Sequence, residues 1–62
     1  MTNEEIAREI TLLVGEYDFP LLVMEDVTRR LTDCQDPYYA AQQLRYLQNI
    51  VKAGLAKKKV NV

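Results

Sequence analysis

The clearest pattern of apolar and polar positions in the chain lies between residues 37 and 53. At the helical step of about 100° per residue, the apolar side chains share one face and the polar side chains the opposite face. The apolar face holds Ala40, Leu44, Leu47 and Val51, and the polar face holds Tyr38, Gln42, Arg45, Asn49 and Lys52. Asp36 suits a helix N-cap, Pro37 suits the first helical position, and Gly54 suits a left-handed stop. The pattern predicts a capped amphipathic helix over residues 37–53.

A second amphipathic pattern covers residues 3–14. Thr2 and Glu5 have the spacing of a capping box, and Gly15 is a natural helix stop. The apolar face of this predicted helix holds Ile6, Ala7, Ile10, Leu13 and Val14. Leu12 falls on the opposite side, and an isolated exposed leucine is ordinary on a protein surface. In so small a domain, Leu12 is still the first candidate for a contact between subunits.

Residues 20–33 allow two interpretations. In the first, residues 20–23 form a short buried strand and a helix follows over residues 24–33. In the second, Pro20 is the first residue of a longer helix that runs to residue 33. The periodicity fits both, because Val27 and Leu31 share a helical face in either case, and we favour a helix over residues 24–33 with residues 20–23 extended or frayed. Cys34 lies on the same arc, so we expect a small buried side chain rather than a nucleophile.

The connections between these segments indicate one mainly α domain over residues 1–62. Residues 34–36 are a very short link between two helices, which gives a helix-turn-helix outline. Near the C-terminus, Val60 and Val62 alternate with polar residues, so residues 56–62 are predicted to form a short strand. Residues 21–23 are the only plausible partner for that strand within the chain.

The length and composition of the chain limit what can stabilise it. A domain of 62 residues buries only about 60% of the surface that its unfolded chain exposes. A single cysteine and no histidine exclude an intramolecular disulfide and a structural zinc site. We therefore expect a homodimer, formed through Leu12 or the C-terminal strand. No apolar run is long enough to span a bilayer and the N-terminus is not a signal peptide, so we expect a cytoplasmic protein without membrane contact.

The net charge of −1 hides a strong separation of charge along the chain. Residues 1–26 contain seven acidic side chains and one arginine, whereas residues 27–62 contain seven basic and two acidic side chains. The two parts therefore carry charges of −6 and +5, which sum to the net −1. A basic part of this kind suits a nucleic acid or an acidic protein partner.

Several kinds of chemistry are missing from the sequence. The chain has no histidine and no serine, so neither a Ser-His-Asp triad nor a Cys-His pair can form. The only glycines are Gly15 and Gly54, so no glycine-rich phosphate loop occurs. We therefore expect neither an enzyme nor a cofactor or metal site.

The end of the third predicted helix carries a resemblance to a known family. Leu47, Ile50, Ala53, Gly54 and Leu55 fit the pattern L-x-x-L-x-x-A-G-L, and the basic residues 57–59 follow. This pattern resembles the end of the recognition helix in winged-helix DNA-binding domains. Residues 24–31 are similar to the second helix of that family, and residues 20–23 would be its short first strand. The resemblance covers residues 20–59 and implies a three-helix helix-turn-helix domain with little or no wing.

The resemblance also implies a mode of binding. The third helix would lie in the major groove of double-stranded DNA, with Gln42, Arg45 and Asn49 nearest the bases. The other implied contacts would neutralise phosphates, and they are Tyr38, Lys52, Arg29, Arg30, Lys57, Lys58 and Lys59. Two features depart from the family. The third helix is about one turn longer than usual, and the sequence stops at Val62 without the return strand of the wing.

Two functions fit these observations. The first is a small sequence-specific DNA-binding regulator that acts as a homodimer on a two-fold site. The second is a protein-interaction module on the same fold, such as an inhibitor or adaptor, which the acidic first helix and Leu12 favour. RNA binding is less favoured because the sequence has no aromatic stacking motif of an RNA-binding module.

Overall fold

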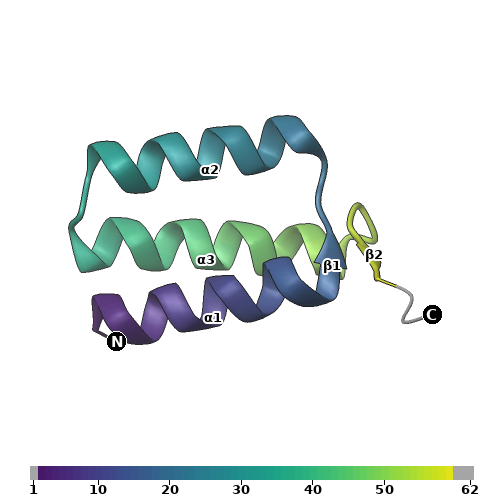
Figure 1. Cartoon of the computed structure of the whole chain (residues 1–62), viewed down its shortest axis with the longest axis horizontal. Coiled ribbons are helices and arrows are strands. Elements are labelled where there is room, and N and C mark those ends of the chain that lie inside the picture. The colour runs from purple at the N-terminus through teal and green to yellow at the C-terminus, as the bar shows by residue number, and fades with distance from the viewer. Residues whose placement is uncertain (1, 60–62) are drawn as a thin grey trace.

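The chain folds into helices that are joined end to end by short links (Figure 1). The structure is a computed structural model, and it describes residues 2–59. Within these residues it contains, in chain order, α1 (Asn3–Glu16), β1 (Tyr17–Asp18), α2 (Leu21–Asp33), α3 (Pro37–Lys52) and β2 (Lys57–Lys58). The predicted mainly α class, with a helix-turn-helix-like outline and a short strand after the third helix, is confirmed.

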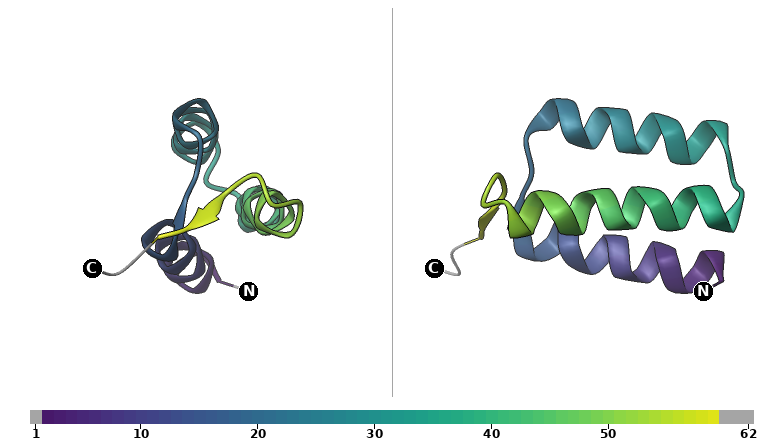
Figure 2. Two further views of the ribbon diagram at one scale, coloured as in Figure 1. Left: turned by 90° about the vertical axis from the view of Figure 1, so that its right-hand side faces the viewer. Right: turned by 180° about the vertical axis from the view of Figure 1, so that it is seen from behind.

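The helices lie side by side, with α1 and α3 running in one direction and α2 running in the other (Figure 1). Because only residues 34–36 connect them, α2 and α3 form an αα-hairpin. Seen end-on in Figure 2, the three helices occupy the corners of a triangle. Helix α3 packs against both of the others, and more extensively against α1 than against α2. The long third helix is therefore the element on which the other two rest.

Helix α1 starts as predicted but ends two residues later. The Thr2 hydroxyl accepts a hydrogen bond from the Glu5 backbone N–H at 3.2 Å, so the predicted cap is confirmed. The prediction that Gly15 stops the helix is wrong, because α1 continues to Glu16. The Tyr17 N–H, just beyond the helix, donates a hydrogen bond to the Leu13 carbonyl, so this carbonyl at the end of α1 has a partner. Gly15 is an ordinary helical residue and does not have a positive φ.

The favoured interpretation of residues 20–23 as extended or frayed backbone is wrong, because residues 21–23 are helical. Helix α2 begins at Leu21, with Pro20 as its N-cap, so the alternative of a longer helix is correct to within one residue. The Met24 N–H donates to the Pro20 carbonyl at 3.1 Å, which is the first helical hydrogen bond of α2. Proline has a fixed φ and no N–H, and both properties suit the entry of a helix. Residues 21–23 therefore have a helical backbone conformation and cannot join a sheet.

The strand pairing also differs from the prediction. β2 pairs in antiparallel register with β1, so that Tyr17 lies opposite Lys58 and Asp18 opposite Lys57. The Lys59 N–H extends this pairing by donating to the Glu16 carbonyl at 2.7 Å. The prediction that residues 21–23 are the partner is thus wrong, because the extended residues before Pro20 take that place. Of the predicted strand over residues 56–62, Val60 and Val62 lie outside the described residues.

Helix α3 has both of the predicted end caps. The Asp36 carboxylate accepts a hydrogen bond from the Tyr38 backbone N–H at 2.8 Å, and Pro37 occupies the first turn. The helix ends at Lys52, and Gly54 follows with a φ of 76°, the left-handed conformation that favours glycine. The predicted helix over residues 37–53 is confirmed to within one residue.

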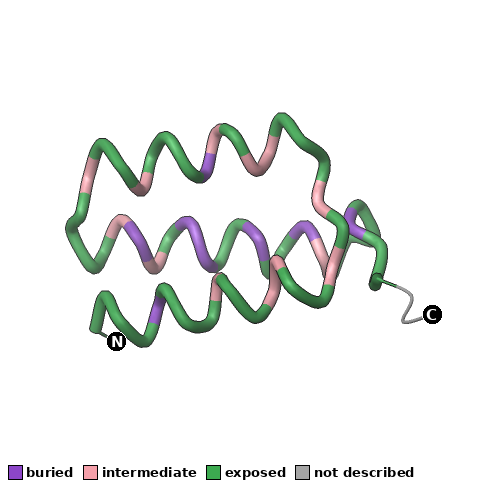
Figure 3. The backbone as a smooth tube through the Cα atoms, in the orientation of Figure 1, coloured by how far each residue is buried: buried purple, intermediate pink, exposed green. Residues whose placement is uncertain are grey.

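The core lies along the inner side of α3 (Figure 3). Leu47 of α3 is fully buried at 0% exposure, and Ile6 of α1 is buried at 1%. The predicted apolar face of α3 is largely confirmed, since three of its four residues are buried and Val51 is half-buried. Cys34 is half-buried rather than buried. The buried apolar residues are Ile6, Val27, Ala40, Leu44, Leu47, Ile50 and Ala56.

Candidate functional site

The polar side chains of α3 form one exposed row. All five of the predicted residues on this face are exposed, and they lie on the side of the helix opposite the buried Leu47. Because α1 and α2 pack on the other side, the row lies away from the core, although Lys52 at its end also lines a hollow with Leu13 and Tyr17. From its first to its last residue the row is about 21 Å long at 1.5 Å per residue. We call it the α3 face, and it consists of Tyr38, Gln42, Arg45, Asn49 and Lys52.

The N-terminal half of the α3 face contains a shallow hollow. Its volume is about 430 Å³, and its lining consists of Pro37, Tyr38, Ala41 and Arg45. The Tyr38 ring is 86% exposed, although Tyr38 follows the N-cap of a well-formed helix. A bulky aromatic side chain left in solvent beside a guanidinium can stack on a planar group and hydrogen-bond an anion through its hydroxyl. The small Ala41 side chain leaves room for such a group between them.

The charge of the α3 face is modestly positive. Arg45 and Lys52 are its two cations, and it carries no acidic side chain. Gln42 and Asn49 add amide groups, each of which both donates and accepts hydrogen bonds. This set of side chains matches the donors and acceptors at base edges, with cations at a spacing suited to phosphates.

The structure gives the two predicted arginines of α2 different roles. Arg30 Nε donates to the Asp26 carboxylate at 2.9 Å, and its Nη1 donates to the Tyr39 hydroxyl at 3.2 Å. These contacts, with Tyr39 the larger cause, raise the pKa of the Arg30 guanidinium. Arg30 thus ties α2 to α3 through its Nε and Nη1 groups. Arg29 is exposed, but it lines a hollow formed by α2 residues alone, away from the α3 face.

The three predicted lysines of the C-terminal segment also have different environments. Lys59 Nζ donates to the Val14 carbonyl at 3.0 Å, in the last turn of α1. An ammonium group at a helix C-terminus is favourable because the helix dipole is negative there. Lys57 and Lys58 are exposed in β2, at the end of the molecule where α3 finishes (Figure 1). These two lysines extend the positive charge beyond Lys52, whereas Lys59 is occupied within the chain.

Sequence reasoning missed three contacts that hold the site in place. Besides those of Arg30 and Lys59, the Asn3 side-chain amide donates to the Gln35 carbonyl at 3.0 Å and so joins α1 to the link before α3. Only the Asp26–Arg30 pair had a local signal, since these residues stand four apart on one helix. The other partners are distant in sequence, and no spacing rule identifies them.

Two other kinds of site are absent from residues 2–59. No cluster of three or more cysteine, aspartate or glutamate side chains in this part of the chain is arranged to hold a metal ion. In the same residues, no helix has both the length and the apolar character that crossing a bilayer requires.

Comparison with known proteins gives one match. A protein-family model described as a family of unknown function (DUF6877) matches residues 7–52, which span most of α1, all of α2 and all of α3. No curated protein and no solved structure matches the chain. The matched region contains the whole α3 face.

Proposed function

Since the chain belongs to the family of unknown function DUF6877, whose description assigns no activity, we propose its function from its surface: it is a small DNA-binding protein that places α3 in the major groove. The proposal rests on one observation. The longest helix of the molecule presents a row of five exposed polar side chains, free of acidic groups, on the side away from the core. A helix held on two others in this way can enter a groove that is about 12 Å wide.

The chemistry of the α3 face suggests how bases and phosphates are divided among its residues. We assign base contacts to Gln42, Arg45 and Asn49, at the middle of the row. An arginine suits the acceptors of guanine, and the two amides suit the donor and acceptor of adenine. Tyr38 and Lys52 stand at the two ends of the row, where the DNA backbone would pass. Lys57 and Lys58 continue the positive charge beyond Lys52 and support phosphate contacts there.

The order of the elements supports the same proposal. The chain runs α1-β1-α2-α3-β2, with the two strands paired, which is the order that the winged-helix resemblance implies, although the first strand lies at residues 17–18. Arg30, Lys59 and their partners fix α2 and β2 against α3 and α1. We therefore remove Arg30 and Lys59, which contact other parts of the chain, and Arg29, which lies away from the α3 face, from the proposed DNA contacts. A regulatory role and a cytoplasmic location are parts of the proposal.

The test is a fluorescence-anisotropy titration of labelled DNA duplexes at low and moderate salt. We expect the purified chain to bind mixed genomic fragments at low salt, with an affinity that falls steeply as salt is added. Arg45→Glu should abolish the binding, while Gln48→Glu, three positions further along the same helix and outside the α3 face, should weaken it much less. Binding that is absent at low salt, or equal for Arg45→Glu and wild type, would refute the proposal.

A second candidate function is protein binding, and a specific observation favours it. Leu21 and Leu22 at the start of α2 are 71% and 79% exposed, and Leu55 after α3 is 67% exposed. The start of α2 and the end of α3 lie at the same end of the molecule (Figure 1). Exposed leucines gathered at one end are typical of surfaces that bind other proteins. One stoichiometric partner recovered from a nuclease-treated lysate, and lost when both Leu22 and Leu55 are changed to Ser, would favour this function.

A further inference from the structure

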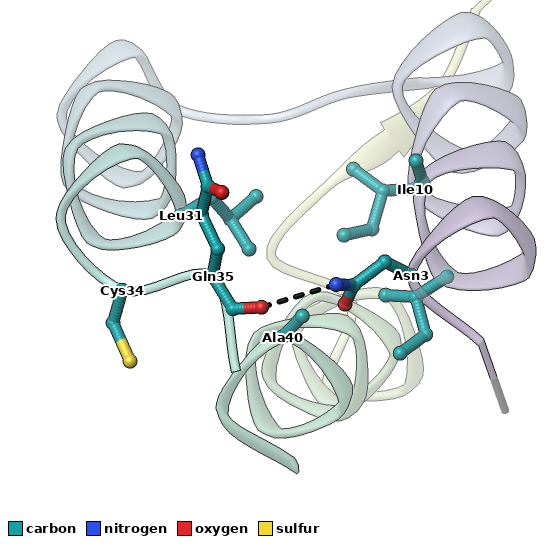
Figure 4. Close-up of a pocket in the computed structure, with 8 residues that line it drawn as sticks. Asn3, Ile10, Leu31, Cys34, Gln35 and Ala40 are labelled. Atoms are coloured by element: carbon teal, nitrogen blue, oxygen red, sulfur yellow. Dashed lines mark hydrogen bonds between the residues drawn. The ribbon is translucent and has the colours of Figure 1, made fainter. Parts of the chain in front are cut away.

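An apolar groove lies between α1 and α2, with α3 as its floor. It contains a hollow with a volume of about 270 Å³ that is lined mainly by apolar side chains. In Figure 4, Ile10 of α1 and Leu31 of α2 extend toward each other across the groove, and Ala40 of α3 lies beneath them. The hydrogen bond from Asn3 to the Gln35 carbonyl closes one end. The groove opens on the side of the molecule opposite the α3 face.

The margins of the groove suit burial against another surface. The Thr11 hydroxyl donates to the Ala7 carbonyl at 2.8 Å, and the Thr32 hydroxyl donates to the Thr28 carbonyl at 2.9 Å. These hydroxyl groups are satisfied within their own helices, so covering them leaves no unpaired donor. On α1 the margin has small side chains four residues apart, at Ala7, Thr11 and Gly15. A Cβ added at Gly15 would meet nothing within 4 Å, so no packing inside the chain requires glycine at that position.

The same face carries an apolar projection at its other end. Leu21 is 71% exposed, and it lies in the first turn of α2, far from the closed end of the groove. At about 100° per residue, Leu21, Met24, Thr28 and Leu31 fall on one side of α2, so Leu21 stands on the groove side. One end of this face is therefore a hollow and the other end is a projecting leucine. A surface of this kind can pair with a copy of itself after a two-fold rotation.

We propose that the occupant of this groove is a second copy of the chain, related by a two-fold axis that runs across the groove. The rotation reverses the ends, so Leu21 of one protomer approaches the hollow lined by Ile10 and Leu31 of the other. It also places the two α2 helices antiparallel, crossing near the middle of the helix at the level of the buried Val27. A domain of this size has a marginal core, and covering the groove enlarges it.

The charges on α2 agree with this pairing. Glu25 and Arg29 are exposed, and both line a hollow beside Met24 and Thr28. They stand two residues before and two residues after the midpoint of α2. In the antiparallel arrangement, Glu25 of one protomer faces Arg29 of the other, and the two-fold axis repeats the contact. The pairing is thus complementary in charge as well as in shape.

The dimer does not depend on DNA binding, because the groove and the α3 face lie on opposite sides of α3. The proposed interface differs from the one that the sequence suggested, because Leu12 lies on the side of α1 away from the groove. Sedimentation velocity of the purified chain over a range of concentrations tests the proposal without any nucleic acid. We expect a reversible monomer–dimer equilibrium.

Two exposed positions on α1 provide a matched pair of variants. Ala7→Glu places a carboxylate at the groove margin and should make the protein monomeric at concentrations where wild type is dimeric. Leu12→Glu makes the same kind of change on the opposite side of α1, where Leu12 is 53% exposed, and should leave the dimer intact. Circular dichroism checks that both variants fold. Dimer loss in Leu12→Glu together with an unchanged Ala7→Glu would overturn the proposal.

A charge exchange on α2 tests the geometry itself. Glu25→Arg should weaken the dimer roughly tenfold, because it places two arginines opposite each other at two symmetric positions. Adding Arg29→Glu to the same chain should restore the wild-type association. Failure of the double variant to recover would refute the antiparallel arrangement. A wild-type chain that stays monomeric at all concentrations would refute the second copy as occupant and would leave the groove to a different protein.

Discussion

The ammonium group of Lys59 donates a hydrogen bond to the Val14 carbonyl at 3.0 Å, which joins the end of the described chain to the last turn of α1. The neighbouring backbone pairing of Lys59 with Glu16 reinforces the contact. Together they fasten the segment after α3 across the end of α1. Of the lysines that follow α3, Lys59 therefore has a structural role, whereas Lys57 and Lys58 are exposed in β2.

This contact predicts that Lys59 and Lys57 respond differently to removal of their charge. Lys59→Met should lower the free energy of unfolding by about 0.5–1 kcal/mol, because a helix C-terminus loses its hydrogen-bonded cation. Lys57→Met should change it little, since the Lys57 side chain makes no hydrogen bond within residues 2–59. Urea denaturation at one fixed protein concentration measures both. Equal losses for the two variants would contradict the structural role of Lys59.

Neighbouring arginines of α2 give a second prediction. Arg30→Gln should lower the midpoint of urea denaturation, because it removes the link from Asp26 through the guanidinium to the Tyr39 hydroxyl. Arg29→Gln should leave the unfolding midpoint of the monomer unchanged, since Arg29 is exposed and makes no hydrogen bond to α3. In DNA binding, neutralising Arg30 should matter less than neutralising Lys52. The opposite order would show that Arg30 leaves its partners to contact phosphate.

A third prediction concerns adjacent residues of α3. Asn49 lies on the α3 face, whereas Gln48 is exposed on the side toward α1, where it lines a hollow with Leu13 and Tyr17. Asn49→Ala should reduce discrimination between DNA sequences, at a cost of about 1–3 kcal/mol for the preferred one, because a bidentate base contact is lost. Gln48→Ala should have little effect. Competition binding with duplexes selected from a random pool measures the difference.

These elements show which features of the protein depend on local sequence. Asp36 and Gly54 act on the residues beside them, and the α3 face follows from the helical period, so all of these were predictable. The strand pairing was not, because the apolar residues 21–23 suit a strand and a helix start equally well. Which segment pairs with β2 depends on where α1 ends and on Pro20, which is the N-cap of α2. The contacts of Lys59 and Arg30 join residues 45 and nine positions apart, so no local pattern reveals them.

The last prediction combines the two proposals. A two-fold dimer formed through the α1–α2 groove presents its α3 faces on opposite sides, since each face lies behind its own groove. Each protomer would then hold a separate DNA duplex, and the dimer would link the two. An immobilised duplex should therefore retain a second, fluorescent duplex when wild-type protein is present.

The variant Ala7→Glu separates bridging from binding. As a monomer with an intact α3 face, it should still bind each duplex in an anisotropy titration but should no longer retain the second one. Arg45→Glu should lose both activities while remaining a dimer in sedimentation. A wild-type dimer that occupies two adjacent half-sites of one duplex would contradict this arrangement, because it requires both α3 faces to point the same way. Such a result would move the dimer contact away from the groove and toward Leu12 or the C-terminal strand.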